Sequence, residues 1–173
     1  MTTVDFTTRL YEYDPVLRPY AFNLVKSKER TDDLIQDTFY RAIINKAKFT
    51  EGTNVKAWLF TIMKNIFIND YRKNQKRGTV TDHSENQYLL NSTANSVKND
   101  SERTFMAEEI DKAMQSVSKE FTEPFLMYFN GFKYQEISDK LALPLGTVKS
   151  RIFFARKELQ QRLKGTGLRY SDN

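Results

Sequence analysis

Apolar residues recur at helical spacing along most of this 173-residue chain, in two blocks that a polar stretch separates. The first block, residues 5–73, has a period near 3.6 and is interrupted near Asp14-Pro15 and over Phe49–Asn54. The second block begins near Ser101 and continues to about Leu163. Neither strand-like alternation nor an internal repeat is apparent. The pattern predicts an all-α protein with two small helical domains.

The polar stretch between the blocks lacks a stable apolar period and is rich in Asn, Ser, Thr and Gln. Such a composition cannot bury enough apolar surface to offset the entropy lost on ordering, so we expect a flexible tether. The predicted organisation is an N-terminal domain over residues 1–74, a linker over 75–100, a C-terminal domain over 101–165 and a frayed tail over 166–173.

The second block contains a short helix, a turn marked by Pro144 and a second helix with a cationic face, all within residues 134–163. On the second helix Val148, Ile152, Ala155, Leu159 and Leu163 share one side, against which Ile137 and Leu141 of the first helix can pack. Thr147, Ser150, Arg151 and Phe154 share another side, and Lys149 and Arg156 share a third. This arrangement predicts a helix-turn-helix whose second helix enters a DNA major groove. A helical hairpin with a solvated basic face is the less favoured alternative.

Residues 31–42 predict another helix, with Thr31 as its capping residue and acids in its first turn. Its inward side is expected to carry Leu34, Ile35, Thr38, Phe39 and Ala42. Its outward side is expected to carry Asp33, Gln36, Asp37 and Arg41. Composition alone favours an ordinary solvated face for the outward side.

Residues 57–73 predict a helix with a buried stripe of Trp58, Leu59, Ile62, Met63 and Ile66. A second face carries Phe60, Lys64, Phe67 and Tyr71, with Asn65 and Arg72 at its edge. Aromatic rings stack on unpaired bases and cations meet phosphates, so this face suits single-stranded DNA. The alternative is packing against neighbouring helices, which we favour for Phe67.

Charge is distributed unevenly along the chain, whose overall net charge is +5. Residues 56–77 hold six Lys or Arg and one Asp, and residues 146–173 hold seven Lys or Arg and two acids, so each carries +5. Residues 99–123 hold three Lys or Arg and seven acids and carry −4. Two basic blocks flanking an acidic one are typical of a protein that contacts nucleic acid at both ends.

Other chemistry has little support in the sequence. The chain has no cysteine, and its single histidine, His83, lies in the polar stretch. It shows neither a phosphate-binding glycine loop nor a nucleophile–base pair at a recognisable spacing. We therefore expect no enzyme activity, cofactor, metal or small-molecule substrate. The absence of a signal-peptide pattern and of an apolar run near 18 residues predicts a soluble, cytoplasmic protein.

Taken together, these segments resemble an extracytoplasmic-function (group 4, sigma-70 family) sigma factor of bacterial RNA polymerase. Asp32–Ala42 resembles the helix with which this family grips the polymerase clamp. Phe49–Lys73 resembles its −10 element segment, and Glu123–Leu163 resembles its −35 helix-turn-helix. The resemblance covers nearly the whole chain, in the order that the family has.

The resemblance implies an alternative sigma factor that binds core RNA polymerase and reads −35 duplex and melted −10 DNA. The clamp helices of the largest subunit would contact Asp33, Gln36, Asp37 and Arg41. The loop Phe49–Asn54 would hold a flipped-out −10 base, and the −10 contacts would comprise Phe49, Thr50, Asn54, Lys64, Asn65, Arg72 and Lys73. The −35 contacts would comprise Thr147, Lys149, Ser150, Arg151, Phe154 and Arg156. An anti-sigma factor would be a further partner.

Phe154 departs from the family, many of whose members carry Arg or another polar residue at this position. Phenylalanine cannot donate a hydrogen bond but can contact a thymine methyl group, so an unusual −35 preference is expected there. A conventional helix-turn-helix regulator is the alternative function. It would use residues 105–165 for DNA and the N-terminal block for sensing or dimerisation.

Overall fold

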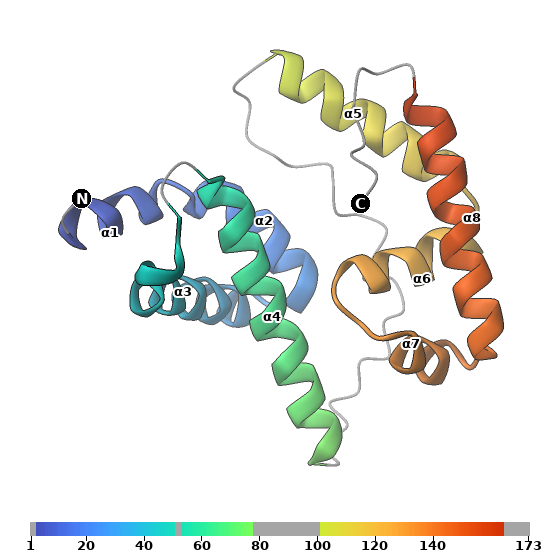
Figure 1. Cartoon of the computed structure of the whole chain (residues 1–173), viewed down its shortest axis with the longest axis horizontal. Helices are drawn as coiled ribbons and strands as arrows, with labels where there is room; N and C mark the ends of the chain where they lie inside the picture. Colours follow the sequence, from blue (N-terminus) through green and yellow to red (C-terminus); the bar gives the residue numbers. More distant parts are fainter. Residues whose placement is uncertain (1–2, 51–52, 78–100, 165–173) are drawn as a thin grey trace. The chain divides into compact units, whose positions relative to one another are not determined.

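The computed structural model describes residues 3–50, 53–77 and 101–164, with only the helical backbone described for residues 3–5 and 101–107. The chain divides into two compact units, residues 1–88 and 89–173, and every regular element of the described ranges is helical (Figure 1). The predicted all-α fold with two helical domains is confirmed. Residues 78–100 and 165–173, which hold most of the predicted linker and the tail, lie outside the described residues.

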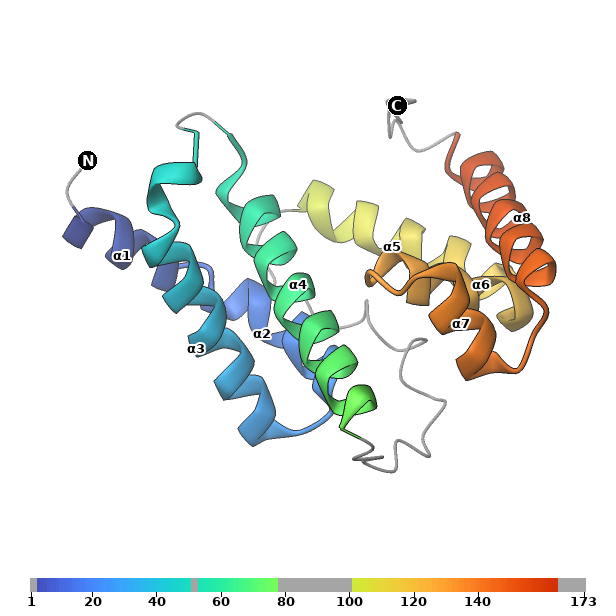
Figure 2. The ribbon, with the colours of Figure 1, turned by 60° about the horizontal axis from the view of Figure 1, so that its bottom comes forward.

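The N-terminal unit contains α1 (Thr3–Tyr11), α2 (Asp14–Val25), α3 (Lys28–Ile44), the 3-10 turn η1 (Lys46–Lys48) and α4 (Val55–Lys76). The break predicted at Asp14-Pro15 separates α1 from α2. Pro15 stands in the first turn of α2, where its missing N–H group costs no hydrogen bond. Helices α3 and α4 pack along each other, and α2 contacts both (Figure 2). Helix α4 continues to Lys76, past residue 74, at which the sequence predicts the domain to end.

The start of α3 differs from the prediction, because Thr31 is not the capping residue. Ser27 caps the helix, and its side chain accepts a hydrogen bond from the backbone N–H of Arg30 at 3.4 Å. Thr31 lies inside the helix and is buried, with its hydroxyl donating to the Ser27 carbonyl at 2.7 Å. A threonine that satisfies its hydroxyl on the preceding turn can continue a helix as well as start one.

The core of the N-terminal unit is formed by the faces that the periodicity predicts to be buried. All five inward residues of α3 are buried, as are Leu59, Met63 and Ile66 of α4. Trp58 and Ile62 are partly buried and pack against the same core. Phe6 and Leu10 of α1 join it, with 3% and 1% of their surface exposed. Helix α1 is therefore an integral part of this unit.

The C-terminal unit contains α5 (Ser101–Ser116), α6 (Lys119–Phe129), α7 (Tyr134–Leu141) and α8 (Leu145–Leu163). The other three helices each pack against α8. All five apolar residues that the sequence assigns to the inward side of α8 are buried, namely Val148, Ile152, Ala155, Leu159 and Leu163. Ile137 of α7 is fully buried and Leu141 is partly buried. The prediction of the buried stripe is confirmed.

The turn of the predicted helix-turn-helix is closed by hydrogen bonds at the end of α7. Ala142 adopts a left-handed conformation with φ of 51°, which reverses the chain. The backbone N–H of Leu143 donates to the Ser138 carbonyl at 3.1 Å, and the Ser138 hydroxyl donates to the Leu143 carbonyl at 2.5 Å. Pro144 then stands immediately before α8. These contacts fix the direction in which α8 leaves the turn.

Within the described ranges, none of the helices is both long and apolar enough to cross a membrane. The same ranges contain no group of three His, Cys, Asp or Glu side chains that could hold a metal ion.

Candidate nucleic-acid and partner interfaces

The outward face of α3 presents the four predicted partner-binding residues to solvent. Asp33, Gln36, Asp37 and Arg41 are all exposed, opposite the buried stripe of the same helix. The face continues toward the end of the helix with Tyr40 and Ile44, which are 63% and 60% exposed. These two residues are additions to the predicted face, and their helical spacing from Asp33 and Asp37 places them on the same side.

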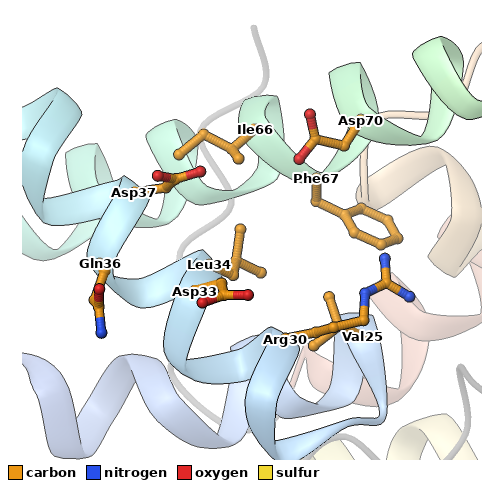
Figure 3. Close-up of a pocket in the computed structure, with 9 residues that line it drawn as sticks. All are labelled: Val25, Arg30, Asp33, Leu34, Gln36, Asp37, Ile66, Phe67 and Asp70. Carbon is orange, nitrogen blue, oxygen red and sulfur yellow. The ribbon is translucent and has the colours of Figure 1, made fainter.

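Acidic side chains of α3 and α4 border a groove of about 360 Å³. Figure 3 shows Asp33 and Asp37 on α3 on one side and Asp70 on α4 on the other, while Gln36 points away from α4. The lining residues are Val25, Arg30, Asp33, Leu34, Gln36, Asp37, Ile66, Phe67 and Asp70. The groove therefore combines an apolar floor with a rim that is mainly acidic, and Asp70 is an addition to the residues predicted from sequence.

The neighbouring acid Asp32 is engaged within the protein. Arg18 of α2 forms ion pairs with Asp32 and with Asp14. Both carboxylates raise the pKa of the Arg18 guanidinium, and Asp32 has the larger effect. Among the ion pairs of the described residues, none involves Asp33 or Asp37. Their charges thus remain directed toward solvent and the groove.

The predicted −10 loop, whose residues 51–52 lie outside the described ranges, begins at a packed ring and ends at a helix cap. The Phe49 ring is partly buried and packs against Trp58 at 5.1 Å between ring centroids. Thr50 is exposed, and its carbonyl accepts hydrogen bonds from the backbone N–H and the hydroxyl of Thr53. The Asn54 side chain caps α4 by accepting a hydrogen bond from the N–H of Ala57 at 3.1 Å. Phe49 and Asn54 thus shape the loop, and their contact with DNA stays a prediction.

Aromatic residues on the second face of α4 pack inward. The Phe60 ring meets the Tyr20 ring edge-on at 5.0 Å, and Phe67 is partly buried against the core. Burial raises the pKa of the Tyr20 hydroxyl. The prediction that Phe67 packs against neighbouring helices is confirmed, and Phe60 packs in the same way.

The polar residues predicted to contact −10 DNA lie along the rest of α4. Asn65 and Lys73 are exposed, and Arg72 and Lys64 are half-buried. Burial lowers the pKa of the Lys64 ammonium. Lys73 forms an ion pair with Asp70 at 3.7 Å, so this lysine also neutralises part of the acidic rim.

Three predicted −35 residues of α8 make contacts within the protein. Arg151 pairs with Glu120 of α6 at 3.3 Å. The Ser150 hydroxyl donates to the Gly146 carbonyl at 2.7 Å. The Arg156 guanidinium lies 5.2 Å from the centre of the Tyr128 ring, which stacks on Tyr134 at 5.0 Å. These contacts orient the three side chains before any partner arrives.

The remaining outward face of α8 is basic and aromatic. Lys149 is exposed, Thr147 is partly exposed and Phe154 is 46% exposed, with its ring 6.1 Å from that of Phe121 on α6. Phe153 is 61% exposed and Lys157 is exposed as well. Phe153 and Lys157 are additions to the predicted −35 face, and their helical spacing from Ser150 is the signal that could have identified them.

The sequence of each unit matches a known protein family. Residues 10–77 match the family model of sigma-70 region 2, and residues 107–159 match that of sigma-70 region 4. The ECF RNA polymerase sigma factor EcfG of Rhodopseudomonas palustris (strain TIE-1) is 33% identical over 146 residues, covering 84% of this chain and 77% of the relative. The chain belongs to the extracytoplasmic-function sigma factors of the sigma-70 family.

Two Bacillus subtilis (strain 168) proteins are also similar to this sigma factor. The ECF RNA polymerase sigma factor SigM is 29% identical, covering 91% of this chain and 93% of the relative. The RNA polymerase sigma factor YlaC is 28% identical, covering 87% of each. A solved complex of the sigma factor RpoE with the anti-sigma factor NepR from Bartonella quintana matches at 30% identity and a TM-score of 0.44, covering 93% of this chain and 98% of that one.

Membership of this family makes the chain an alternative sigma factor, which directs promoter-specific transcription initiation. The N-terminal unit is its region 2 and the C-terminal unit is its region 4. The alternative function, a conventional helix-turn-helix regulator, is not favoured. Such a regulator would use the N-terminal block for sensing or dimerisation, but residues 10–77 of this block match sigma-70 region 2.

Proposed function

We propose that this sigma factor recognises its promoters at two points, with α3 docked on the clamp helices of the largest polymerase subunit. In this proposal the α4 segment holds separated −10 DNA and α8 reads the −35 duplex. One observation carries it: on both α3 and α8 the apolar stripe is buried, so that predicted contact residues such as Asp33, Asp37 and Lys149 stand at the surface.

The acidic groove supports the clamp contact. A partner helix that fits it needs cationic side chains for Asp33, Asp37 and Asp70 and an apolar group for the floor. Gln36 and Arg41 would add hydrogen bonds at the margins, and Tyr40 and Ile44 would extend the apolar contact. Complementary charge would speed encounter with the polymerase and fix the register of docking.

For the −10 element, the support is the polar surface of α4 and the loop before it. Asn65 offers an amide that can read a base edge, and Lys64, Arg72 and Lys73 offer cations for phosphates. Thr50 stands at the loop, with Phe49 and Asn54 holding its two ends. Phe60 and Phe67 pack against the core of the unit, so we do not propose that their rings stack on DNA bases.

For the −35 element, the support is the outward face of α8. Lys149 and Lys157 are exposed cations that would meet phosphates or guanine edges, and Phe153 and Phe154 offer apolar surface for thymine methyl groups. Arg151 would leave Glu120 and bind DNA instead. Arg156 would contact DNA while its guanidinium stays against the Tyr128 ring. Thr147 and Ser150 would contact the DNA backbone near the start of α8.

We propose no catalytic role for this chain, which would act in the cytoplasm as a regulatory subunit without a cofactor. The polymerase would carry out all covalent chemistry. An anti-sigma factor that holds the free protein inactive stays a prediction from the family resemblance.

Reconstituted transcription tests the proposed function. The purified chain mixed with core RNA polymerase should initiate at specific sites on a promoter library without any other sigma factor. If initiation required a second sigma factor, the proposal would be contradicted and the regulator alternative would be revived.

A charge-reversal series tests the clamp contact. Asp33→Arg combined with Asp37→Arg should weaken core polymerase binding by about tenfold or more, since like charges would face the basic partner. Glu12→Arg is the control, because this acid is also exposed but lies in the turn between α1 and α2 and not on α3. Equal binding by both variants would contradict the assignment of α3.

A further inference from the structure

Three aromatic rings gather where α1 meets the two ends of the −10 loop. The Phe6 ring of α1 lies 6.2 Å from the Phe49 ring and 6.4 Å from the Trp58 ring, and the latter two are 5.1 Å apart. All three pairs have tilted geometry, and Phe6 is only 3% exposed. Tilted aromatic pairs at these distances attract each other beyond simple apolar burial.

The positions of these rings in the chain relate the cluster to the loop. Phe49 directly precedes Thr50, and Trp58 lies in the first turn of α4, just after Asn54. Thr50 and Thr53 are joined by hydrogen bonds of 3.1 and 2.7 Å. The ring of Phe6 therefore contacts the residue that enters the loop and the helical turn that leaves it.

Phe6 is itself held firmly. The ammonium of Lys46, in the turn η1, lies 5.5 Å from the centre of the Phe6 ring, and Leu10 anchors the next turn of α1 in the core. Helix α1 also packs on α3. The Phe6 ring thus links α1, which is distant from the loop in sequence, to the segments on both sides of the loop.

We propose that Phe6 is a positioning residue for −10 recognition, because its ring braces both ends of the loop that presents Thr50 and Asn54 to DNA. The inference rests on the proposed function and adds a residue to it. The match to sigma-70 region 2 begins at residue 10, so Phe6 lies outside the segment that the family model covers. A contact surface that is fixed before binding loses less entropy when DNA arrives.

The test uses holoenzyme reconstituted from the full chain and core RNA polymerase. A randomised pool of single-stranded DNA is first selected on the wild-type holoenzyme, and the enriched oligonucleotide then serves as the probe. We expect Phe6→Leu to weaken binding of this probe by about tenfold, comparable to the loss of one stacked base. Phe6→Tyr, which keeps the ring, should bind the probe as the wild type does.

Leu17→Ala is the matched control for stability, since Leu17 is equally buried in the core of the same unit but lies in α2 and carries no ring. At a similar loss of thermal stability, Leu17→Ala should keep its affinity for the probe. All variants should bind core polymerase and a −35 duplex as the wild type does. Equal loss of probe binding in Phe6→Leu and Leu17→Ala would overturn the inference, as would full affinity in Phe6→Leu.

A second variant and a spectroscopic readout guard against misfolding. Phe6→Met removes the ring while filling the space, because methionine adapts to irregular gaps. Trp58 is the only tryptophan of the chain, so quenching of its emission by acrylamide in the free protein reports directly on the brace. Phe6→Met should increase this quenching and weaken probe binding, and an unchanged result in either measurement would reject the brace. If the wild-type holoenzyme selected no single-stranded sequence, the −10 proposal itself would fail.

Discussion

Phe154 is an exposed aromatic residue on the face of α8 that we propose to contact the −35 element. Its ring is 46% exposed and rests on Phe121, so it has a fixed direction and an open side. We expect Phe154→Arg to change the preferred −35 base from thymine to guanine, because Arg binds guanine through two hydrogen bonds. Selection from a randomised −35 duplex pool by each holoenzyme measures the change.

Replacing thymine by uracil in the selected −35 duplex gives an independent check, since it removes only the methyl group. Burial of one such group is worth about 0.8 kcal/mol, or roughly fourfold in affinity. The wild type should lose this factor and Phe154→Arg should not. An unchanged base preference in the variant, with no effect of uracil on the wild type, would count against the methyl contact.

Thr122 of α6 is a second residue with a measurable consequence. It is fully buried, and its hydroxyl has no hydrogen-bond partner within the described part of the chain. An unsatisfied buried hydroxyl costs about 1–3 kcal/mol, so Thr122→Val should stabilise the C-terminal unit by about 1 kcal/mol. Urea unfolding followed by circular dichroism measures the change, while Trp58 fluorescence follows the N-terminal unit separately.

Thr38→Val provides the matched control for Thr122→Val. Thr38 is also fully buried, but its hydroxyl donates to the Leu34 carbonyl at 2.7 Å. Losing that bond should leave the N-terminal unit equally stable or less stable. A stability gain at Thr38 matching that at Thr122 would show that the unsatisfied hydroxyl is not the cause.

At the scale of one element, an ion pair to α6 holds Arg151 of α8, which we propose to contact −35 DNA. Arg151 pairs with Glu120 at 3.3 Å, and both side chains are partly exposed, so the pair contributes at most about 1 kcal/mol. Glu120→Gln should release Arg151 and raise the affinity for a −35 duplex by up to about fivefold. Fluorescence anisotropy with the holoenzyme measures this affinity.

Glu158→Gln controls for the simple removal of one negative charge. Glu158 pairs with Arg162 near the end of the same helix, at 3.8 Å. If Glu158→Gln raised the affinity as much as Glu120→Gln, the gain would come from net charge alone. A gain confined to Glu120→Gln would instead identify the release of Arg151.

The elements also show which parts of the structure can be predicted from the sequence. The buried stripes of α3 and α8 were predictable because a regular apolar period leaves one orientation that removes it from water. Thr31 was assigned wrongly because a threonine hydroxyl can bond the preceding turn as readily as it caps a helix. Local sequence does not distinguish these two uses.

Contacts between distant segments account for most of what the sequence did not reveal. Phe60 packs on Tyr20, and Phe6 packs on Phe49 and Trp58, in each case between residues at least 40 positions apart. The ion pair of Arg151 with Glu120 has the same character. Periodicity indicates which side of a helix is apolar but does not indicate which partner covers it.

At the scale of the whole molecule, two basic surfaces belong to separate units. Lys64 lies on α4 of region 2, and Lys149 lies on α8 of region 4. Because the two modules belong to one chain, binding by one raises the effective concentration of the other at the promoter. In the proposed function, promoter specificity then arises from both DNA contacts together.

This arrangement predicts that phosphate contacts in the two units act independently. Lys64→Ala and Lys149→Ala should each weaken holoenzyme binding to promoter DNA and each lower the slope of log affinity against log salt by about 1. Since the two residues belong to separate units, the double variant should show the sum of both free-energy losses to within about 0.5 kcal/mol. Arg151→Ala with Glu120→Gln is the positive control, because this directly paired couple must deviate from additivity. A comparable deviation for Lys64 with Lys149 would mean that the two units contact the promoter as one coupled surface, which contradicts reading by two independent modules.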